Sequence, residues 1–217
     1  MFGLHTNANI AFEFKTVNYF VDTVLTMQPR ASGGKAVKTP EEIVTDMAIE
    51  FEKGLPKNLD LSKAHELTFA KTEQGIENSL GVFIKQEIAR FNKLLTVIRA
   101  SLVDLQKAIQ GTVVMSMELE AMFKSFIDTK VPNNWMGVGY PCLKPLGSWM
   151  KDLIRRIEFI GNWLYQGTPS SYWIPAFFFP QGFMTASLQT YARKTSTAID
   201  TLAFRTNVTM MNSASEV

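Results

Sequence analysis

The chain has 217 residues, of which 46% are hydrophobic, and this composition is that of an ordinary globular protein rather than a disordered one. Its 22 basic and 20 acidic residues give a formal net charge of +2, spread along the sequence, which argues against nucleic acid as a partner. A single cysteine excludes an intramolecular disulfide, and no apolar run is long enough to cross a membrane.

The N-terminal region predicts one helix after a lead-in segment. Residues 1–12 show no clear apolar periodicity, which predicts an extended conformation. They also lack the basic and apolar regions of a signal peptide, so we expect a soluble protein of the cytoplasm. Apolar residues at helical spacing then predict a helix over residues 14–28, which Pro29 ends.

A loop and a strong helix start follow. Residues 31–38 are predicted to form a solvated loop, because its Gly-Gly-Lys string is followed by Ala36, where a phosphate-binding loop needs Ser or Thr. Thr39 and Glu42 are predicted to form a capping box at the start of a helix over residues 40–53. The acidic residues of this helix are expected to face solvent rather than to hold a metal ion.

The two histidines carry no sign of a functional site. His65 lies in residues 61–71, which predict a short helix that opens at Ser62, and His5 lies far away in the lead-in segment. A zinc or acid/base site needs further ligands or charged partners close by, so neither histidine is predicted to bind a metal or to take part in catalysis.

The longest predicted helix spans residues 78–110 and organises the rest of the sequence. No proline interrupts it, and Gly111 follows it at the position that favours a left-handed backbone. The charged residues of this helix, including Glu87 and Arg90, are predicted to lie on its solvated side. An unbroken row of apolar residues in steps of three and four predicts the structural core: Ile88, Phe91, Leu95, Ile98, Leu102, Leu105 and Ile109.

A return helix and a boundary come next. The helix is predicted over residues 112–130, with an inward face made by Val113, Val114, Met117, Ala121 and Phe126. Residues 132–145 hold three prolines and two glycines, which predict a domain boundary. Cys142 lies in this stretch without a nearby histidine, so it is not predicted to be a nucleophile.

The C-terminal part predicts two helices around a dense aromatic run. The helices span residues 146–166 and 181–194, and the run lies between them at residues 172–180. The run is interpreted either as a wedge in the core or as a patch that faces a partner, since so many aromatic side chains require cover. As a patch, its candidate interface residues are Tyr172, Trp173, Phe177, Phe178 and Phe179.

The apolar period differs in the last residues. Apolar and polar residues alternate over residues 202–208, which predicts a short strand. A lone strand has no partner in an otherwise helical protein, so we expect the rest of a sheet beyond residue 217. The predicted fold class is mainly α, a helical bundle followed by a second helical segment with a short terminal β-strand.

Seven blocks of sequence, in order, resemble the C-terminal part of dynein heavy chains, most closely those of cilia and flagella. Together they cover nearly the whole sequence and are far more specific than a short motif. They are FGLHTNANI from Phe2, TPEEIV from Thr39, EIARFNKLL from Glu87, SLVDLQKAIQGTVVMSMELE from Ser101, VPNNW from Val131, YPCLKPLGSWMKDLIRRIEFI from Tyr140 and WIPAFFFPQGFMTASLQTYARK from Trp173.

The resemblance implies a division of the sequence. Residues 1–131 resemble the small helical lid of the sixth AAA+ module of the motor ring. Residues 140–217 resemble the first, helical part of the family's C-terminal domain, before its β-barrel. In the family that module does not hydrolyse nucleotide, so the resemblance implies no catalytic, cofactor-binding or metal-binding residue in this segment. ATP and magnesium would belong to upstream modules of the parent polypeptide.

The function implied is a non-catalytic structural and mechanical segment of an ATP-driven, minus-end-directed microtubule motor in the axoneme of a cilium or flagellum. Its partners would be the other AAA+ modules of the same heavy chain and, through the parent polypeptide, the axonemal dynein complex and microtubules. The alternative is a free-standing helical adaptor that binds a protein partner through residues 172–180. An independent enzyme ranks last, because the sequence lacks a nucleophile, a metal constellation and a phosphate loop.

Overall fold

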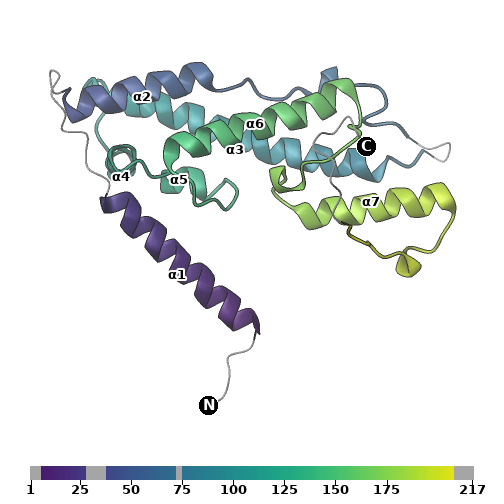
Figure 1. Cartoon of the computed structure of the whole chain (residues 1–217). Coiled ribbons are helices and arrows are strands. Elements are labelled where there is room, and N and C mark those ends of the chain that lie inside the picture. The colour runs from purple at the N-terminus through teal and green to yellow at the C-terminus, as the bar shows by residue number, and fades with distance from the viewer. Residues whose placement is uncertain (1–5, 28–37, 72–74, 208–217) are drawn as a thin grey trace, which may run out of the picture. The chain divides into compact units, whose positions relative to one another are not determined.

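The computed structural model describes residues 6–27, 38–71 and 75–207, and its regular secondary structure is helical (Figure 1). The only β-pairing among these residues is an isolated antiparallel bridge between Lys71 and Glu77. The predicted mainly α fold class is therefore confirmed. The α-helices are α1 Thr6–Met27, α2 Pro40–Gly54, α3 Ser79–Ile109, α4 Met117–Ile127, α5 Asn133–Met136, α6 Leu146–Gln166 and α7 Pro180–Thr195, and short 3₁₀ turns are η1 Leu61–Lys63, η2 Ile174–Ala176 and η3 Ile199–Thr201.

The predicted terminal strand falls partly outside the described residues. Leu202 has an extended backbone, and residues 202–207 pair with no other strand within the part of the sequence that the structure describes. Val208 lies outside that part. The strand and the sheet expected beyond it therefore stay predictions.

The lead-in segment is shorter than predicted. α1 begins at Thr6, so residues 6–12 are helical and not extended. The reason is visible in the spacing, since Ile10 lies four residues before Phe14 and continues the same apolar row by one more turn. His5 lies outside the described residues.

The helix predicted over residues 61–71 is also wrong in extent. Only the 3₁₀ turn η1 forms, and its N-cap is Asp60, whose Oδ1 accepts the backbone N–H of Ser62 at 3.0 Å. The backbone then leaves helical geometry at Ala64, and Thr68 is buried with its hydroxyl 3.3 Å from the carbonyl oxygens of Trp163 and Leu164. A side-chain cap that closes a short turn competes with helix growth here.

The return helix is shorter than predicted, and of the five residues expected on its inward face only Phe126 is buried, while the other four are exposed. α4 begins only after Ser116, whose hydroxyl accepts the N–H of Leu119. Residues 112–116 therefore form a connection, and Val114 and Met117 are exposed at 87% and 88%. The buried positions of α4 are Met122 and Phe126, which lie four residues apart and therefore share one face of the helix.

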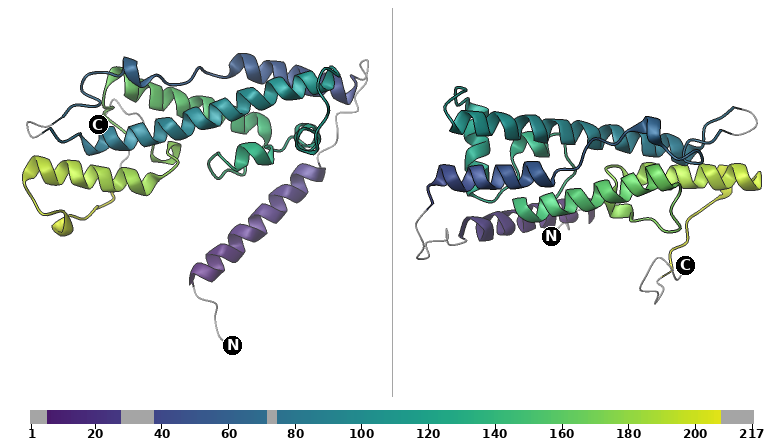
Figure 2. Two further views of the ribbon diagram at one scale, coloured as in Figure 1. Left: turned by 180° about the vertical axis from the view of Figure 1, so that it is seen from behind. Right: turned by 90° about the horizontal axis from the view of Figure 1, so that it is seen from above.

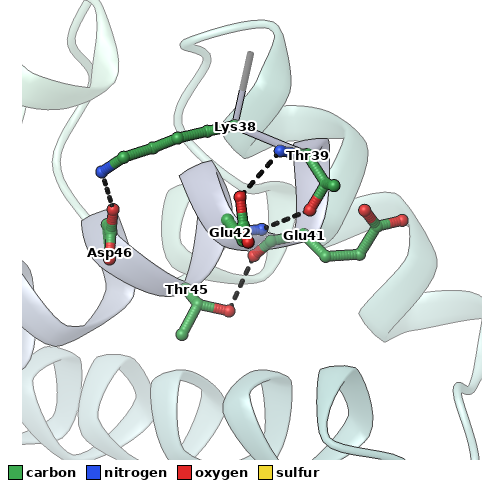
Figure 3. A network of polar contacts seen from close by, with 6 residues as sticks. All are labelled: Lys38, Thr39, Glu41, Glu42, Thr45 and Asp46. Atoms are coloured by element: carbon green, nitrogen blue, oxygen red, sulfur yellow. Dashed lines mark hydrogen bonds and ion pairs between the residues drawn. The ribbon is translucent and has the colours of Figure 1, made fainter. Parts of the chain in front are cut away.

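The start of α2 is capped as predicted (Figure 3). The backbone N–H of Thr39 donates to Glu42 Oε2 at 3.0 Å, and the N–H of Glu42 donates to Thr39 Oγ1 at 3.2 Å. Lys38 reaches along the same helix to pair with Asp46. The capping box satisfies two N–H groups that the helix itself leaves without partners.

Replacing Thr39 by alanine is expected to lower the free energy of unfolding by about 0.5–2 kcal/mol. The reason is that the backbone N–H of Glu42 would lose its acceptor, the Thr39 hydroxyl. Thr45→Ala is the matched control, since the Thr45 hydroxyl only donates to the Glu41 carbonyl inside the helix. Urea unfolding of both variants measures the difference. Equal losses in the two variants would contradict a capping role for Thr39.

The helix α3 is unbroken from Ser79 to Ile109 in every view (Figure 2). It ends in a left-handed Gly111 with φ 74°, as predicted, and the N–H groups of Gly111 and Thr112 donate back to Ala108 and Lys107. Of the predicted row, six side chains are fully buried and only Ile109 is partly exposed. Phe83, Ile84 and Leu94 are buried too, so the buried face is wider than the row.

The contacts divide the protein into two compact units, each built from two separate stretches. One unit holds residues 1–54 and 97–151, and the other holds residues 55–96 and 152–217. The helices α3 and α6 contribute residues to both units. The two domains predicted from the sequence, residues 1–131 and 140–217 with a boundary at residues 132–145, stay a prediction.

The first unit is held by a series of aromatic contacts. Phe51 of α2 meets Phe126 of α4 at 5.9 Å between ring centroids, and Phe126 meets Trp135 of α5 at 5.8 Å. Trp135 stacks on Trp149 of α6 at 5.8 Å. The Trp135 indole N–H also donates to the hydroxyl of Ser101 on α3 at 2.8 Å, which satisfies its one buried polar atom.

Candidate functional site: two buried carboxylates and the aromatic segment

The aromatic segment, residues 172–180, belongs to the second unit, and two of its residues, Ala176 and Phe177, are buried in the core. Phe177 is buried, with its ring 5.0 Å from those of Phe83 and Phe183. Phe178 packs edge-on against Phe91 of α3 at 4.7 Å. Of the five candidate interface residues, Tyr172, Trp173 and Phe178 are partly exposed, and only Phe179, at 48%, is exposed.

A buried carboxylate on α3 holds this segment by its backbone. The Glu87 side chain is fully buried, and its Oε2 accepts the backbone N–H of Phe178 at 2.6 Å. Its Oε1 accepts from Arg90 Nη1 at 3.0 Å, and the Arg90 guanidinium lies 5.9 Å from the centroid of the Phe179 ring. The expectation that Glu87 lies on the solvated side is therefore wrong.

The signal for this burial was present in the sequence. Glu87 lies four residues after Phe83, three after Ile84 and four before Phe91, and all three of these are buried on the same helix. A carboxylate at the centre of an apolar arc requires partners, and the two that it finds come from Arg90 and from the segment 91 residues further along the sequence.

A second buried carboxylate, on α6, holds the same segment through an arginine. Asp152 Oδ2 accepts from Arg156 Nε at 2.6 Å, and the exposed fractions of their side chains are only 6% and 11%. Arg156 Nη1 donates to the backbone carbonyl of Pro175 in the aromatic segment. The Arg156 guanidinium also lies 5.5 Å from the centroid of the Trp173 ring, a favourable cation–π distance.

Burial raises the pKa of Glu87 above its ordinary value of 4.5, while the N–H groups of Phe178 and Phe179 and the charge of Arg90 oppose that rise. In the pH range between 4.5 and the raised pKa, the folded state therefore holds a proton that the unfolded state has lost. The contribution of Glu87 to stability is fully present below pH 4.5 and is lost as the pH rises through the folded pKa.

The free energy of unfolding of the wild type, minus that of Glu87→Gln, is accordingly expected to fall as the pH is raised from about 4 to 8. The glutamine side chain does not titrate, so the difference isolates the proton of Glu87. Urea unfolding at a series of pH values measures it. A difference that stays constant, or that grows with pH, would show that the folded pKa is not raised.

The remaining candidate groups are used in local structure. The Nδ1 atom of His65 accepts the N–H of Leu67 at 3.2 Å, and the backbone N–H of His65 donates to the Leu164 carbonyl at 2.8 Å. Cys142 is partly exposed. Within residues 6–27, 38–71 and 75–207, no three acidic, histidine or cysteine side chains come together as metal ligands, and no helix is long and apolar enough to span a membrane.

Both carboxylates are hydrogen-bonded within the protein, and their bonds hold the backbone of the aromatic segment. Glu87 and Asp152 each fix part of the aromatic segment, one from α3 and one from α6. The class that this arrangement defines is a mainly helical fold in which buried charged side chains hold the backbone of a connecting segment.

Comparison with known proteins gives the family. The sequence profile of the C-terminal domain of dynein heavy chains matches residues 14–217. The protein is 47% identical over 208 residues to human dynein axonemal heavy chain 6, and 43% identical over 206 residues to rat dynein axonemal heavy chain 1, matches that cover 96% and 94% of its length. It is 40% identical over 209 residues, 95% of its length, to the Chlamydomonas reinhardtii dynein-1-beta heavy chain of the flagellar inner arm I1 complex.

The protein therefore belongs to the dynein heavy chain family, and its sequence is that of the C-terminal region. The matched segment makes up only 5%, 4% and 4% of those three relatives. Their axonemal and flagellar origin confirms the location expected from the sequence, the axoneme of a cilium or flagellum.

Proposed function

We propose that this segment is a structural and mechanical part of an axonemal dynein heavy chain and takes no part in catalysis itself. It closes and braces the AAA+ ring of an ATP-driven, minus-end-directed microtubule motor. ATP and magnesium are bound by other modules of the parent polypeptide. Its direct partners are those modules, and it acts on microtubules and within the axonemal dynein complex only through the parent polypeptide.

The main support for this proposal is that buried charged side chains hold the backbone of the aromatic segment in place. A brace must keep its shape when its neighbours move, and rigid elements transmit a displacement better than elements with many accessible conformations. The continuous helix α3, with its fully buried apolar side chains, supports such a role. So do Glu87 and the Asp152–Arg156 pair, which fix a connecting segment that hydrophobic contacts alone would leave free to slide.

An antibody raised against this segment tests the proposal in an extract of ciliated cells. We expect it to detect a heavy chain of which the segment is about 5%, as in the relatives. That polypeptide should pellet with microtubules in the absence of ATP and be released when ATP is added. A polypeptide of 24.4 kDa that stays in the supernatant under both conditions would contradict the proposal.

The second candidate function, a helical adaptor that binds a partner through residues 172–180, is favoured by one observation. Ile174 and Phe179 of the aromatic segment are exposed at 38% and 48%. The 24.4 kDa outcome of the same experiment would support this adaptor function, since a free-standing protein of that size has no ring to brace.

A further inference from the structure

The C-terminal end of α7 carries an exposed serine behind two basic side chains. Arg193 and Lys194 lie in the last turn of the helix, and Ser196 is its C-cap. All three residues are exposed. In the whole sequence, Ser196 is the one serine or threonine that has basic residues at both the third and the second position before it. Positive charge and access therefore coincide at this hydroxyl group.

Two cations at a fixed spacing before a hydroxyl form a pattern that an enzyme can recognise by charge. Protein kinases select their substrates in part by the charges beside the target residue. Acidic side chains in the substrate groove of a kinase can pair with arginine and lysine, whose charges are permanent at neutral pH. The pattern at Arg193 and Lys194 therefore favours a kinase that recognises basic residues, with Ser196 as its target.

The backbone at Ser196 favours local opening of the helix end. Its φ of 52° lies in the left-handed region, which is unfavourable for a residue with a Cβ atom. The N–H groups of Ser196 and Thr197 both donate to the carbonyl of Ala192. Residues 193–201 are all exposed, so opening of this last turn breaks backbone bonds but uncovers no buried side chain. Helix ends of this kind open at little cost, which lets the segment enter the groove of a kinase.

Other hydroxyl groups near basic residues lack one of these features. Ser101 has Arg99 two positions before it, but it is partly buried and its oxygen accepts the indole N–H of Trp135 at 2.8 Å. Thr96 has Lys93 three positions before it and is exposed, but it lies in the middle of α3, which its buried side chains hold closed. Thr96 is therefore an internal control for the effect of helix opening.

We propose that Ser196 is a phosphorylation site for a serine/threonine kinase that recognises basic residues. In the reaction the Ser196 oxygen attacks the γ-phosphorus of ATP, and the bond from that phosphorus to the oxygen it shares with the β-phosphate breaks. The hydroxyl proton passes to a carboxylate of the kinase, and ADP leaves. This modification is separate from the bracing role, because it uses none of the contacts of Glu87 or Arg156.

A phosphate on Ser196 would change what Arg193 contacts. Arg193 Nη1 donates to the backbone carbonyl of Glu77 at 3.3 Å, which ties the end of α7 to the residues before α3. A phosphate carries a charge of about −1.5 to −2 at pH 7 and attracts a guanidinium more strongly than a neutral carbonyl does. Phosphorylation is therefore expected to draw Arg193 away from Glu77 and to make the positive end of α7 about neutral.

The test incubates the purified whole protein with magnesium ATP and the catalytic subunit of cyclic-AMP-dependent protein kinase, a kinase of this specificity. Mass spectrometry of the peptides locates the phosphate. We expect phosphate on Ser196 and none on Thr96 or Ser101. Ser196→Ala should remove it, and Arg193→Gln or Lys194→Gln should each lower kcat/KM about tenfold or more, the loss expected for one charge pair in a substrate groove.

Two variants serve as matched controls. Thr197→Ala removes the neighbouring hydroxyl, and Lys63→Gln removes an exposed cation elsewhere in the same unit. Both are expected to be phosphorylated on Ser196 at the wild-type rate, and circular dichroism checks that every variant is folded. Absence of phosphate on Ser196, phosphate on Thr96, or a rate that Arg193→Gln and Lys194→Gln leave unchanged would overturn the proposal.

Discussion

Replacing Leu102 by alanine is expected to lower the free energy of unfolding by about 2–5 kcal/mol. Leu102 lies within the buried row of α3 with no exposed surface, and its neighbours Ile98 and Leu105 in the same row are equally buried. Alanine would lose the transfer free energy of the removed methine and of the two methyl groups. It would also leave a cavity that a helix packed on this face cannot close by local movement.

Urea unfolding followed by circular dichroism measures this loss. Asp104→Ala is the matched control, because residue 104 lies on the exposed side of the same helical turn and the substitution deletes a side chain of similar length. It is expected to change stability by less than about 0.5 kcal/mol. A loss of that small size for Leu102→Ala would show that the predicted row is not a core.

Asp152→Ala is expected to lower the free energy of unfolding by about 3–5 kcal/mol, the usual cost of leaving one member of a buried ion pair without its partner. Arg156 is 9% exposed and would keep its charge, so its Nε would lose the acceptor that lies 2.6 Å away. The loss should also loosen the aromatic segment, because Arg156 is the donor to the Pro175 carbonyl.

A double replacement separates the cost of an unpaired charge from the worth of the pair. Asp152→Leu combined with Arg156→Met removes both charges and keeps similar volume, so it is expected to be clearly less destabilising than Asp152→Ala. Glu158→Ala removes an exposed carboxylate of the same helix and should be nearly neutral. If Asp152→Ala were as mild as Glu158→Ala, the pair would not hold the segment.

Much of the helical framework follows from local rules that act on neighbouring residues. The capping box at Thr39 and Glu42 and the left-handed Gly111 depend on residues within one turn, and both were predicted correctly. The row from Ile88 to Leu105 follows from helical period alone, since side chains three and four apart must share a face. Such features need no knowledge of what packs against them.

The candidate site could not be predicted by the same rules, because its contacts join residues far apart in the sequence. Glu87 meets Phe178 across 91 positions, and a charged residue on a helix is by default a solvated one. For Val114 the prediction is wrong in the opposite direction: this apolar residue was predicted to face inward but is exposed, and apolar atoms contribute much of any protein surface.

Amide hydrogen exchange along α3 tests the central claim, that this helix is one continuous element with a buried apolar face. The account predicts slow exchange as a single block from about Ile84 to Ile109, with Thr96 and Val97, where the two compact units divide, as protected as their neighbours. Fast exchange at Thr96 and Val97, or at Ile98 and Leu102, would show that the helix is broken or hydrated along that face, and it would contradict the claim.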